Sequence, residues 1–312
     1  MRACCLLLGS LLTALLLVAC APPRPPATLA ALPSGFPLVV TDDAGRSVQF
    51  AAPPARLVSL SPGHTETLYA LGAGDRLIAT DRYSDHPAAN APKATLTTYP
   101  RPNVEEIVAL RPDLLVVLRE DDELIRLVEP HGIAVLKLYP TSFDGTLDDI
   151  ELLGRVLGVP EQARRVTAEM RERAAAVRAR TAAAARPRVL YELDASDPAR
   201  VWVAGSSGFF GDLVPLAGGE NVFADLGSPA AQVSTEQVVA RDPEIIILAD
   251  AGAPLNPQTP EMVRARAGWG AVAAVRANRI VPVSADLLSR PGPRLVEGLE
   301  RMARLLHPEL LP

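Results

Sequence analysis

Cysteine is scarce in this 312-residue chain. The three cysteines are Cys4, Cys5 and Cys20, all within the first twenty residues. The rest of the chain therefore cannot form an internal disulfide bond, and a folded body must be stabilised by its core. Hydrophobic residues make up 48% of the chain, which is enough to fill the cores of two domains of ordinary size.

The chain also lacks a surplus of basic residues. Its 31 lysines and arginines are outnumbered by 36 aspartates and glutamates, and the formal net charge is −5. A surface that binds nucleic acid needs a positively charged face. The sequence therefore predicts no nucleic-acid partner.

Histidine is rare as well. The chain has only His64, His86, His131 and His307, and they form no cluster with carboxylates at a spacing typical of metal ligands. We therefore expect no resident metal ion and no resident cofactor. His131 and His307 are predicted to lie in a loop or at a helix end.

The first residues resemble a secretory signal. A single basic residue, Arg2, precedes an apolar stretch that is too short for a stable membrane span. Leu17-Val18-Ala19-Cys20 resembles a bacterial lipobox, in which the cysteine becomes the lipidated first residue; a plain signal peptide is the alternative. We predict a signal peptide over residues 1–19 and lipidation at Cys20, which implies an extracytoplasmic protein, periplasmic or at the cell surface.

A proline-rich segment follows the predicted lipidation site. Residues 20–37 contain the stretch APPRPPATLAALPSGFP, whose composition favours an extended and poorly packed tether. Two or more acyl chains at Cys20 would make the membrane anchoring stable.

The body of the chain contains one pattern twice. Residues 103–117 read NVEEIVALRPDLLVV, and residues 234–248 read STEQVVARDPEIIIL. Each copy predicts a capped helix that ends before a proline and leads into a buried strand. The matched glutamates, Glu105 and Glu236, fall in the first helical turn, where the helix dipole favours a carboxylate.

Strand and helix patterns alternate through the rest of the body. This alternation predicts an α/β fold with two similar lobes, over residues 38–159 and 188–312, each a sheet flanked by helices. Residues 160–187 are rich in Ala and Arg, have Pro160 at the start and contain no glycine. They predict a single long helix bridging the lobes.

This organisation resembles the helical-backbone class of substrate-binding lipoproteins that serve ABC importers for metal chelates and corrinoids. The resemblance is carried by DDAGRSVQF, RLVSLSPGHTETLYALGAGDRLIATDRYSDHP, the two repeated units, LAGGENVF and GWGAVAAVRANRIVPV, and it covers residues 38–312. It implies two Rossmann-like lobes, a monomer, a small-molecule ligand held between the lobes, and a permease dimer as partner. It also implies that Glu105 and Glu236 dock against arginines of the permease.

The stretch ending in YSDHP is most similar to the vitamin B12-binding branch. The resemblance implies that Tyr83 lies against a corrin ring, and an apolar plate of that kind suits flat side chains. Leu118 and the pair Leu287-Leu288 stand where that branch tends to have tryptophan. The full set of expected ligand-binding residues is Ser61, Pro62, His64, Tyr83, His86, Tyr99, Arg101, Leu118, Trp202, Phe209, Leu287 and Arg290.

Other ligands and other classes of function stay open at this point. Ferric siderophores are one alternative, because Arg82, Arg101, Arg119 and Arg290 could pair with an anionic chelate. Heme is another, with Tyr83, His64 or His86 as axial ligands. A lipid-anchored hydrolase is disfavoured, because Ser61, His64 and Glu66 fall in the first turns of one helix and cannot form a triad, so we expect no enzymatic activity. A surface scaffold lipoprotein is a further class of function, besides the binding protein and the hydrolase.

Overall fold

The computed structural model describes residues 35–88, 94–98, 101–118, 122–253 and 256–311. The predicted signal peptide, Cys20 and the predicted tether up to residue 34 lie outside the described residues. The described residues from Gly35 onward belong to one compact unit. Within it, the two lobes are described below as the N-lobe and the C-lobe.

The N-lobe contains a five-stranded parallel sheet with the strand order β5-β4-β3-β6-β7. An antiparallel pair, β1 and β2, precedes it in the chain. The strands of this lobe are β1 (Leu38–Thr41), β2 (Ser47–Phe50), β3 (Leu57–Ser59), β4 (Leu77–Asp81), β5 (Thr95–Leu96), β6 (Leu114–Val117) and β7 (Ala134–Lys137). Its helices are α1 (Pro62–Ala70), α2 (Val104–Leu110), α3 (Asp122–Val128) and α4 (Phe143–Val156).

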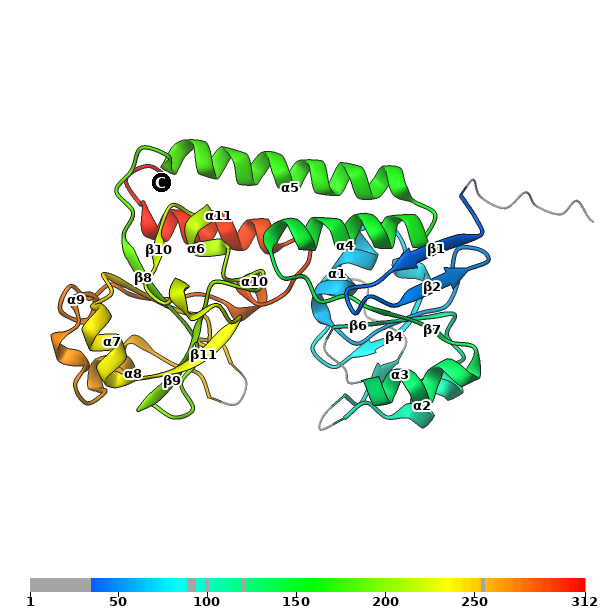
Figure 1. Cartoon of the computed structure of the whole chain (residues 1–312), viewed down its shortest axis with the longest axis horizontal. Helices are drawn as coiled ribbons and strands as arrows, with labels where there is room; N and C mark the ends of the chain where they lie inside the picture. The colour runs from blue at the N-terminus through cyan, green and yellow to red at the C-terminus, as the bar shows by residue number, and fades with distance from the viewer. Residues whose placement is uncertain (1–34, 89–93, 99–100, 119–121, 254–255, 312) are drawn as a thin grey trace, which may run out of the picture. The chain divides into compact units, whose positions relative to one another are not determined.

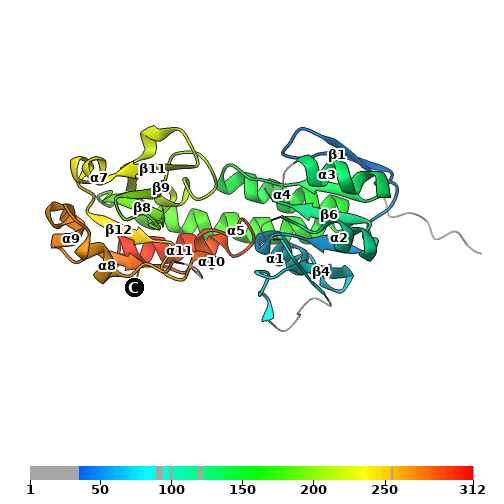
Figure 2. The same cartoon turned by 90° about the horizontal axis from the view of Figure 1, so that it is seen from below.

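The C-lobe contains a mixed sheet with the order β11-β9-β8-β12-β13, and β10 also pairs with β8. Strands β8, β10, β12 and β13 are parallel, whereas β9 runs antiparallel to both of its neighbours. The strands are β8 (Arg188–Asp194), β9 (Arg200–Ala204), β10 (Glu220–Asn221), β11 (Ala230–Ser234), β12 (Ile245–Leu248) and β13 (Ile280–Pro282). The helices are α6 (Leu213–Leu216), α7 (Thr235–Arg241), α8 (Pro260–Ala265), α9 (Ala273–Arg276), α10 (Ala285–Leu288) and α11 (Leu295–Leu306). Figure 2 shows α7, α8 and α9 gathered at one end of this lobe.

The repeated sequence unit forms the same structure in both lobes. Helix α2 leads into β6, helix α7 leads into β12, and all four residues of each strand are buried. The side chain of Asn103 accepts a hydrogen bond from the backbone N–H of Glu106, and Ser234 accepts one from that of Gln237. The predicted caps and buried strands are therefore confirmed.

The two repeated helices also end in the same way. Arg111 and Asp242 both adopt left-handed backbone conformations, with φ of 46° and 40°. Each precedes a proline, which disfavours the right-handed helical conformation in the residue before it. A left-handed residue is a common helix end, and here it turns the chain from helix to strand.

One unbroken helix, α5, occupies Pro160–Thr181. The prediction that this helix continues to residue 187 was wrong at its C-terminal end. Beyond Thr181 the chain must turn to enter β8, and Pro187 disfavours helix in the residue before it. The guanidinium of Arg186 is held there by the carbonyl oxygen of Gly219, at 2.8 Å from Nη2.

Helix α5 packs against the last helix of each lobe. Figure 1 shows α4 beneath α5 over the N-lobe and α11 beneath α5 over the C-lobe, and both helices contact α5. Leu153 of α4, Met170 of α5 and Leu299 of α11 belong to one continuous core cluster. This helical layer joins the lobes through buried apolar surface. None of the helices in the described ranges is both long and apolar enough to cross a membrane.

Candidate functional site

The junction between the lobes lies where β3 and β4 end and α1 begins. A chain of side-chain hydrogen bonds runs from Asp81 to Ser84 (2.5 Å), from Ser84 to Thr65 (2.9 Å) and from Thr65 to Ser59 (3.0 Å). These residues follow the carboxyl ends of neighbouring parallel strands, the usual place for a binding site in an α/β fold. Burial raises the pKa of the Asp81 carboxyl, and the hydrogen bond from Ser84 opposes that rise.

The C-lobe meets residues beside this network through Arg290, because Glu66 and Asp85 are chain neighbours of Thr65 and Ser84. Its Nη1 lies 2.7 Å from Asp85 Oδ1 and 3.4 Å from Glu66 Oε1, while Nη2 lies 2.5 Å from Asp286 of its own lobe. Arg294 adds a second contact of 3.4 Å to Glu66. One arginine therefore connects three carboxylates that come from both lobes.

Glu66 lies beneath this ion-pair cluster. It is 4% exposed, and its Oε2 has no hydrogen-bond partner among the residues that the structure describes. Burial raises the pKa of the Glu66 carboxyl, and the charges of Arg294 and Arg290 oppose the rise. The backbones of the two lobes also approach each other closely here. A Cβ on Gly63 would lie 2.4 Å from the carbonyl oxygen of Pro291. Only a glycine lets the C-lobe segment approach α1 so closely.

The sequence-predicted ligand residues near the junction divide by exposure. Tyr83 and His86 are exposed, and the Arg82 guanidinium lies 5.8 Å from the centre of the Tyr83 ring. Pro62 and Leu287 are half-buried. Ser61 and His64 are buried, and burial lowers the pKa of His64 to about 4.

Two predicted aromatic residues come from the C-lobe. Trp202 on β9 is 43% exposed, whereas Phe209 is buried. The Phe209 ring packs edge-on against Phe210 with the centroids 4.9 Å apart, and Phe210 meets Tyr191 in turn. Trp202 therefore lies on the lobe surface, and Phe209 belongs to the lobe core.

The remaining predicted residues are more scattered. Leu118 is half-buried at the end of β6. Arg101 is exposed and pairs with Glu123 at 2.9 Å. Tyr99 and Arg119 lie outside the described residues.

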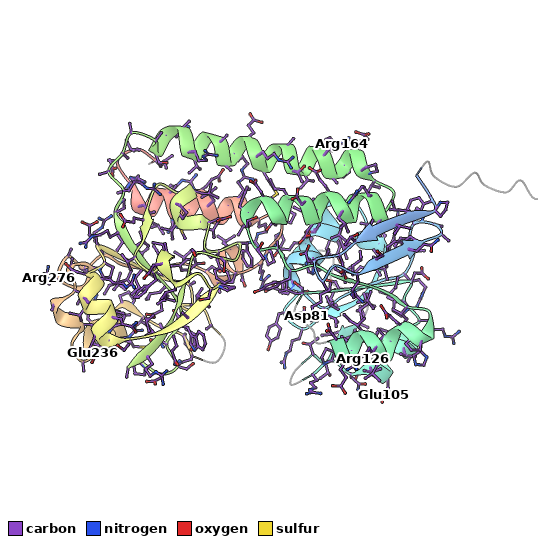
Figure 3. The ribbon with its side chains drawn as sticks, viewed as in Figure 1. Asp81, Glu105, Arg126, Arg164, Glu236 and Arg276 are labelled. Atoms are coloured by element: carbon purple, nitrogen blue, oxygen red, sulfur yellow. The ribbon has the colours of Figure 1, made fainter. Side chains whose placement is uncertain are left out.

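The matched glutamates are both exposed, and neither caps its helix. In the N-lobe it is Glu106 that returns to the helix start, accepting from Asn103 Nδ2 at 3.1 Å. In the C-lobe Gln237 completes the capping box, accepting from the backbone N–H of Ser234 at 2.9 Å. Figure 3 shows Glu105 and Glu236 at the ends of their lobes farthest from α5. The hydroxyl of Ser234 donates to Glu236 and holds the pKa of that carboxyl below its usual range.

Sequence reasoning did not place Glu66, Asp85 and Arg294 in the junction network. Their partners lie about 200 residues away along the chain, as the 205-residue separation of Arg290 from Asp85 shows. No local pattern marks a contact of that range. In the described part of the chain, no group of three or more histidine, cysteine, aspartate or glutamate side chains could hold a metal ion.

Known proteins share both the sequence pattern and the fold. The profile of the periplasmic binding protein family matches residues 57–287. A cobalamin-binding protein of Halobacterium salinarum is 28% identical over 296 residues, covering 91% of this chain and 79% of that one. The solved structure of a periplasmic vitamin B12-binding protein of Vibrio cholerae has a TM-score of 0.67 at 29% identity, over 81% of this chain and 97% of that one.

A second solved structure shares the fold at lower identity. The periplasmic heme-binding protein of Vibrio cholerae has a TM-score of 0.72 at 22% identity, covering 81% of this chain and 99% of that one. The α/β lobes with their helical layer are thus the architecture of these proteins. The chain belongs to the periplasmic binding protein family, as an extracytoplasmic substrate-binding component of ABC transport.

Proposed function

We propose that this protein captures a corrinoid between its lobes and delivers it to the permease of an ABC importer. We choose this ligand because arginines at the lobe junction are already paired with carboxylates. A corrinoid presents an apolar ring and neutral amides, whereas heme and many ferric siderophores present anionic groups. The number of unpaired arginines therefore helps to separate these ligands.

Two of the arginines that suggested an anionic chelate already have carboxylate partners. Arg290 faces Glu66, Asp85 and Asp286, and Arg101 pairs with Glu123. An arginine engaged with carboxylates has little charge left for a ligand, and displacing the partners of Arg290 would leave the buried Glu66 with less compensation. This favours a ligand without strong negative charge.

Exposed aromatic side chains supply the complementary feature. Tyr83 from the N-lobe is 46% exposed and Trp202 from the C-lobe is 43% exposed. Flat side chains of this kind can cover a broad apolar ring. We propose Tyr83, His86, Leu287 and Trp202 as the ligand-facing surface, with Tyr99 and Leu118 as further contacts. The relatives named for cobalamin and vitamin B12 support the same ligand class.

The delivery step rests on Glu105 and Glu236. Each carboxylate is exposed on the first turn of a helix whose capping is performed by another residue. Fixed carboxylates of this kind suit bidentate contacts with arginines, and one per lobe suits a two-fold permease. We propose that both glutamates dock against the permease and that a lipid at Cys20 keeps the protein at the membrane.

A ligand screen tests the first half of the proposal. The mature protein is mixed in turn with cyanocobalamin, cobinamide, hemin and a ferric hydroxamate siderophore, and the absorbance that co-elutes with protein in gel filtration is measured. Retention of the corrinoids is expected. Retention of hemin or the siderophore alone would contradict the corrinoid proposal, and retention of none would favour a scaffold.

Replacement of both glutamates tests the second half. The Glu105→Ala/Glu236→Ala variant should bind cyanocobalamin as the wild type does but should not support its uptake. Glu169→Ala, at an exposed position on α5, serves as the matched control. If the double variant lost ligand affinity instead, the two glutamates would belong to the binding surface.

A further inference from the structure

A pocket in the C-lobe lies beside Glu236. It has a volume of about 510 Å³ and lies between the turn after β8, the first residue of α7 and one side of α8. Thr235, which lines it, is the neighbour of Glu236 in the chain. The apolar members of its lining are Ala195, Pro198, Ala199, Met262, Ala265 and Ala267.

The walls of this pocket are mostly apolar. Alanines, Pro198 and Met262 supply them, and Met262 is 45% exposed. A large apolar side chain at the rim of a concave surface is a typical anchor point for a protein partner. The pocket thus offers apolar contact next to an exposed carboxylate.

The charges at the base of the pocket are already neutralised. Arg266 is buried and makes a double ion pair with Glu192, with N···O distances of 2.5 and 2.7 Å, and it also bonds Gln258 at 2.9 Å. Its guanidinium stacks on Trp269, 4.6 Å from the ring centre. The Nε of Arg266 is buried and has no hydrogen-bond partner among the described residues. An anionic ligand therefore gains little here, whereas an uncharged apolar group fits.

We propose that this pocket receives a loop of the permease, which inserts a bulky apolar side chain beside the arginine that contacts Glu236. A loop with an exposed bulky apolar side chain supplies the group that the mostly apolar lining can bind. The negative charge of Glu236, which follows the lining residue Thr235 in the chain, favours a loop that is also cationic. This inference rests on the proposed function and adds an apolar anchor to its C-lobe docking contact.

Two variants test the pocket without touching the proposed ligand surface. Met262→Glu places a charge at the rim, and Ala265→Trp fills the pocket from an exposed position of α8. Leu310→Glu is the matched control, because Leu310 is 40% exposed and lies outside the pocket lining. Biolayer interferometry measures how tightly each mature protein binds the organism's vitamin B12 permease–ATPase complex in lipid nanodiscs. The cyanocobalamin affinity and the thermal unfolding of each protein are measured as well.

Both pocket variants should bind the permease complex about tenfold or more weakly. Their cyanocobalamin affinity and melting temperature should stay unchanged, and Leu310→Glu should behave as the wild type. If the pocket variants bind normally while Glu105→Ala/Glu236→Ala binds weakly, the pocket inference is wrong and the docking proposal stands. If the double glutamate variant also binds normally, both are wrong. A wild-type dimer in sedimentation analysis that Met262→Glu abolishes would assign the pocket to a second copy and overturn the inference.

Discussion

The guanidinium of Arg290 lies 2.7 Å from the carboxylate of Asp85, so that an ion pair joins the C-lobe directly to the N-lobe. The same guanidinium approaches the buried Glu66 at 3.4 Å. The helical layer of α4, α5 and α11 joins the lobes a second time through apolar contacts. Two attachments of different chemistry favour a modest closure motion over a wide hinge movement.

Replacing Arg290 should destabilise the protein more than replacing an exposed arginine. In Arg290→Gln the buried Glu66 keeps Arg294 as its one cationic partner among the described residues. We expect the free energy of unfolding to fall by about 2 kcal/mol. Arg101→Gln, whose pair with Glu123 is exposed on both sides, should cost no more than about 1 kcal/mol. Urea unfolding at pH 7 measures both. Equal losses of unfolding free energy would show that the Arg290 ion pairs at the junction contribute no more to stability than an exposed pair.

A larger effect is expected at the base of the C-lobe pocket. Arg266→Met leaves Glu192 buried and uncompensated, since the side chain of Glu192 is fully buried. The expected loss is about 3–5 kcal/mol in the free energy of unfolding. Arg264→Met, two residues earlier in an exposed pair with Glu261, should cost less than about 1 kcal/mol. Chemical denaturation followed by circular dichroism compares the two, and a small effect of Arg266→Met would mean that water compensates Glu192.

Asp149 should make the protein less stable as the pH rises. Its Oδ2 is buried with no hydrogen-bond partner in the described part of the chain. Burial, with the charges of Asp43 and Asp148, raises the pKa of its carboxyl to about 8. Because the folded-state pKa lies above the unfolded value of about 3.9, the stability that protonated Asp149 contributes is complete below pH 4. That contribution is lost as the pH rises towards 8. Asp149→Asn should therefore gain at least about 1 kcal/mol at pH 8 and little at pH 4.

The measurement for Asp149 is thermal unfolding of the wild type and the variant from pH 4 to pH 9. Burial also raises the pKa of Asp250 to about 7. The variant should therefore keep part of the decrease in melting temperature with rising pH that the wild type shows. Glu172→Gln, at an exposed position of α5, is the control and should leave the curve unchanged. Parallel curves for the wild type and Asp149→Asn would contradict the assignment of the slope to Asp149.

A methyl group at Gly63 should disturb the lobe junction. Its Cβ would lie 2.4 Å from the carbonyl oxygen of Pro291, and backbone atoms cannot move aside as a flexible side chain can. We expect Gly63→Ala to cost about 1–3 kcal/mol of stability and to weaken cyanocobalamin binding by altering the approach of the lobes. At Gly252 an added Cβ meets no atom of the described residues within 4 Å, so Gly252→Ala should change neither quantity. Calorimetric melting and ligand titration distinguish the two, and an unaffected Gly63→Ala would show that the junction is loose.

The repeated unit could be predicted almost completely from the sequence. Asn103 and Ser234 as caps, the prolines that follow the helices, and the strands β6 and β12 are all local signals, because each depends on neighbours within a few residues. The bridging helix was predictable for the same reason, but its end was not. Thr181 is the last residue of α5 because the chain turns to enter the C-lobe sheet, and that demand comes from a distant part of the fold.

The candidate site was much less predictable. His64 and Phe209 are polar or aromatic residues in stretches that suggested ligand contact, yet both are buried. Trp202 is exposed because β9 turns it outward, and the period-two alternation of β9 agrees with that orientation. The two-lobe link through Arg290 could not be predicted, because a single arginine offers no information about which distant carboxylates it meets.

The sequence by itself determined the α/β class, the duplicated helix–strand unit, the long helix and the matched glutamates in the first turn of each repeated helix. Those features follow from periodicity, capping and proline placement, which act over one or two helical turns. Only the tertiary structure decided which charges are neutralised, because Arg290 and Arg266 meet their carboxylates across long stretches of chain. It also decided which candidate side chains are exposed, since burial is set by what packs on each element and not by the element itself.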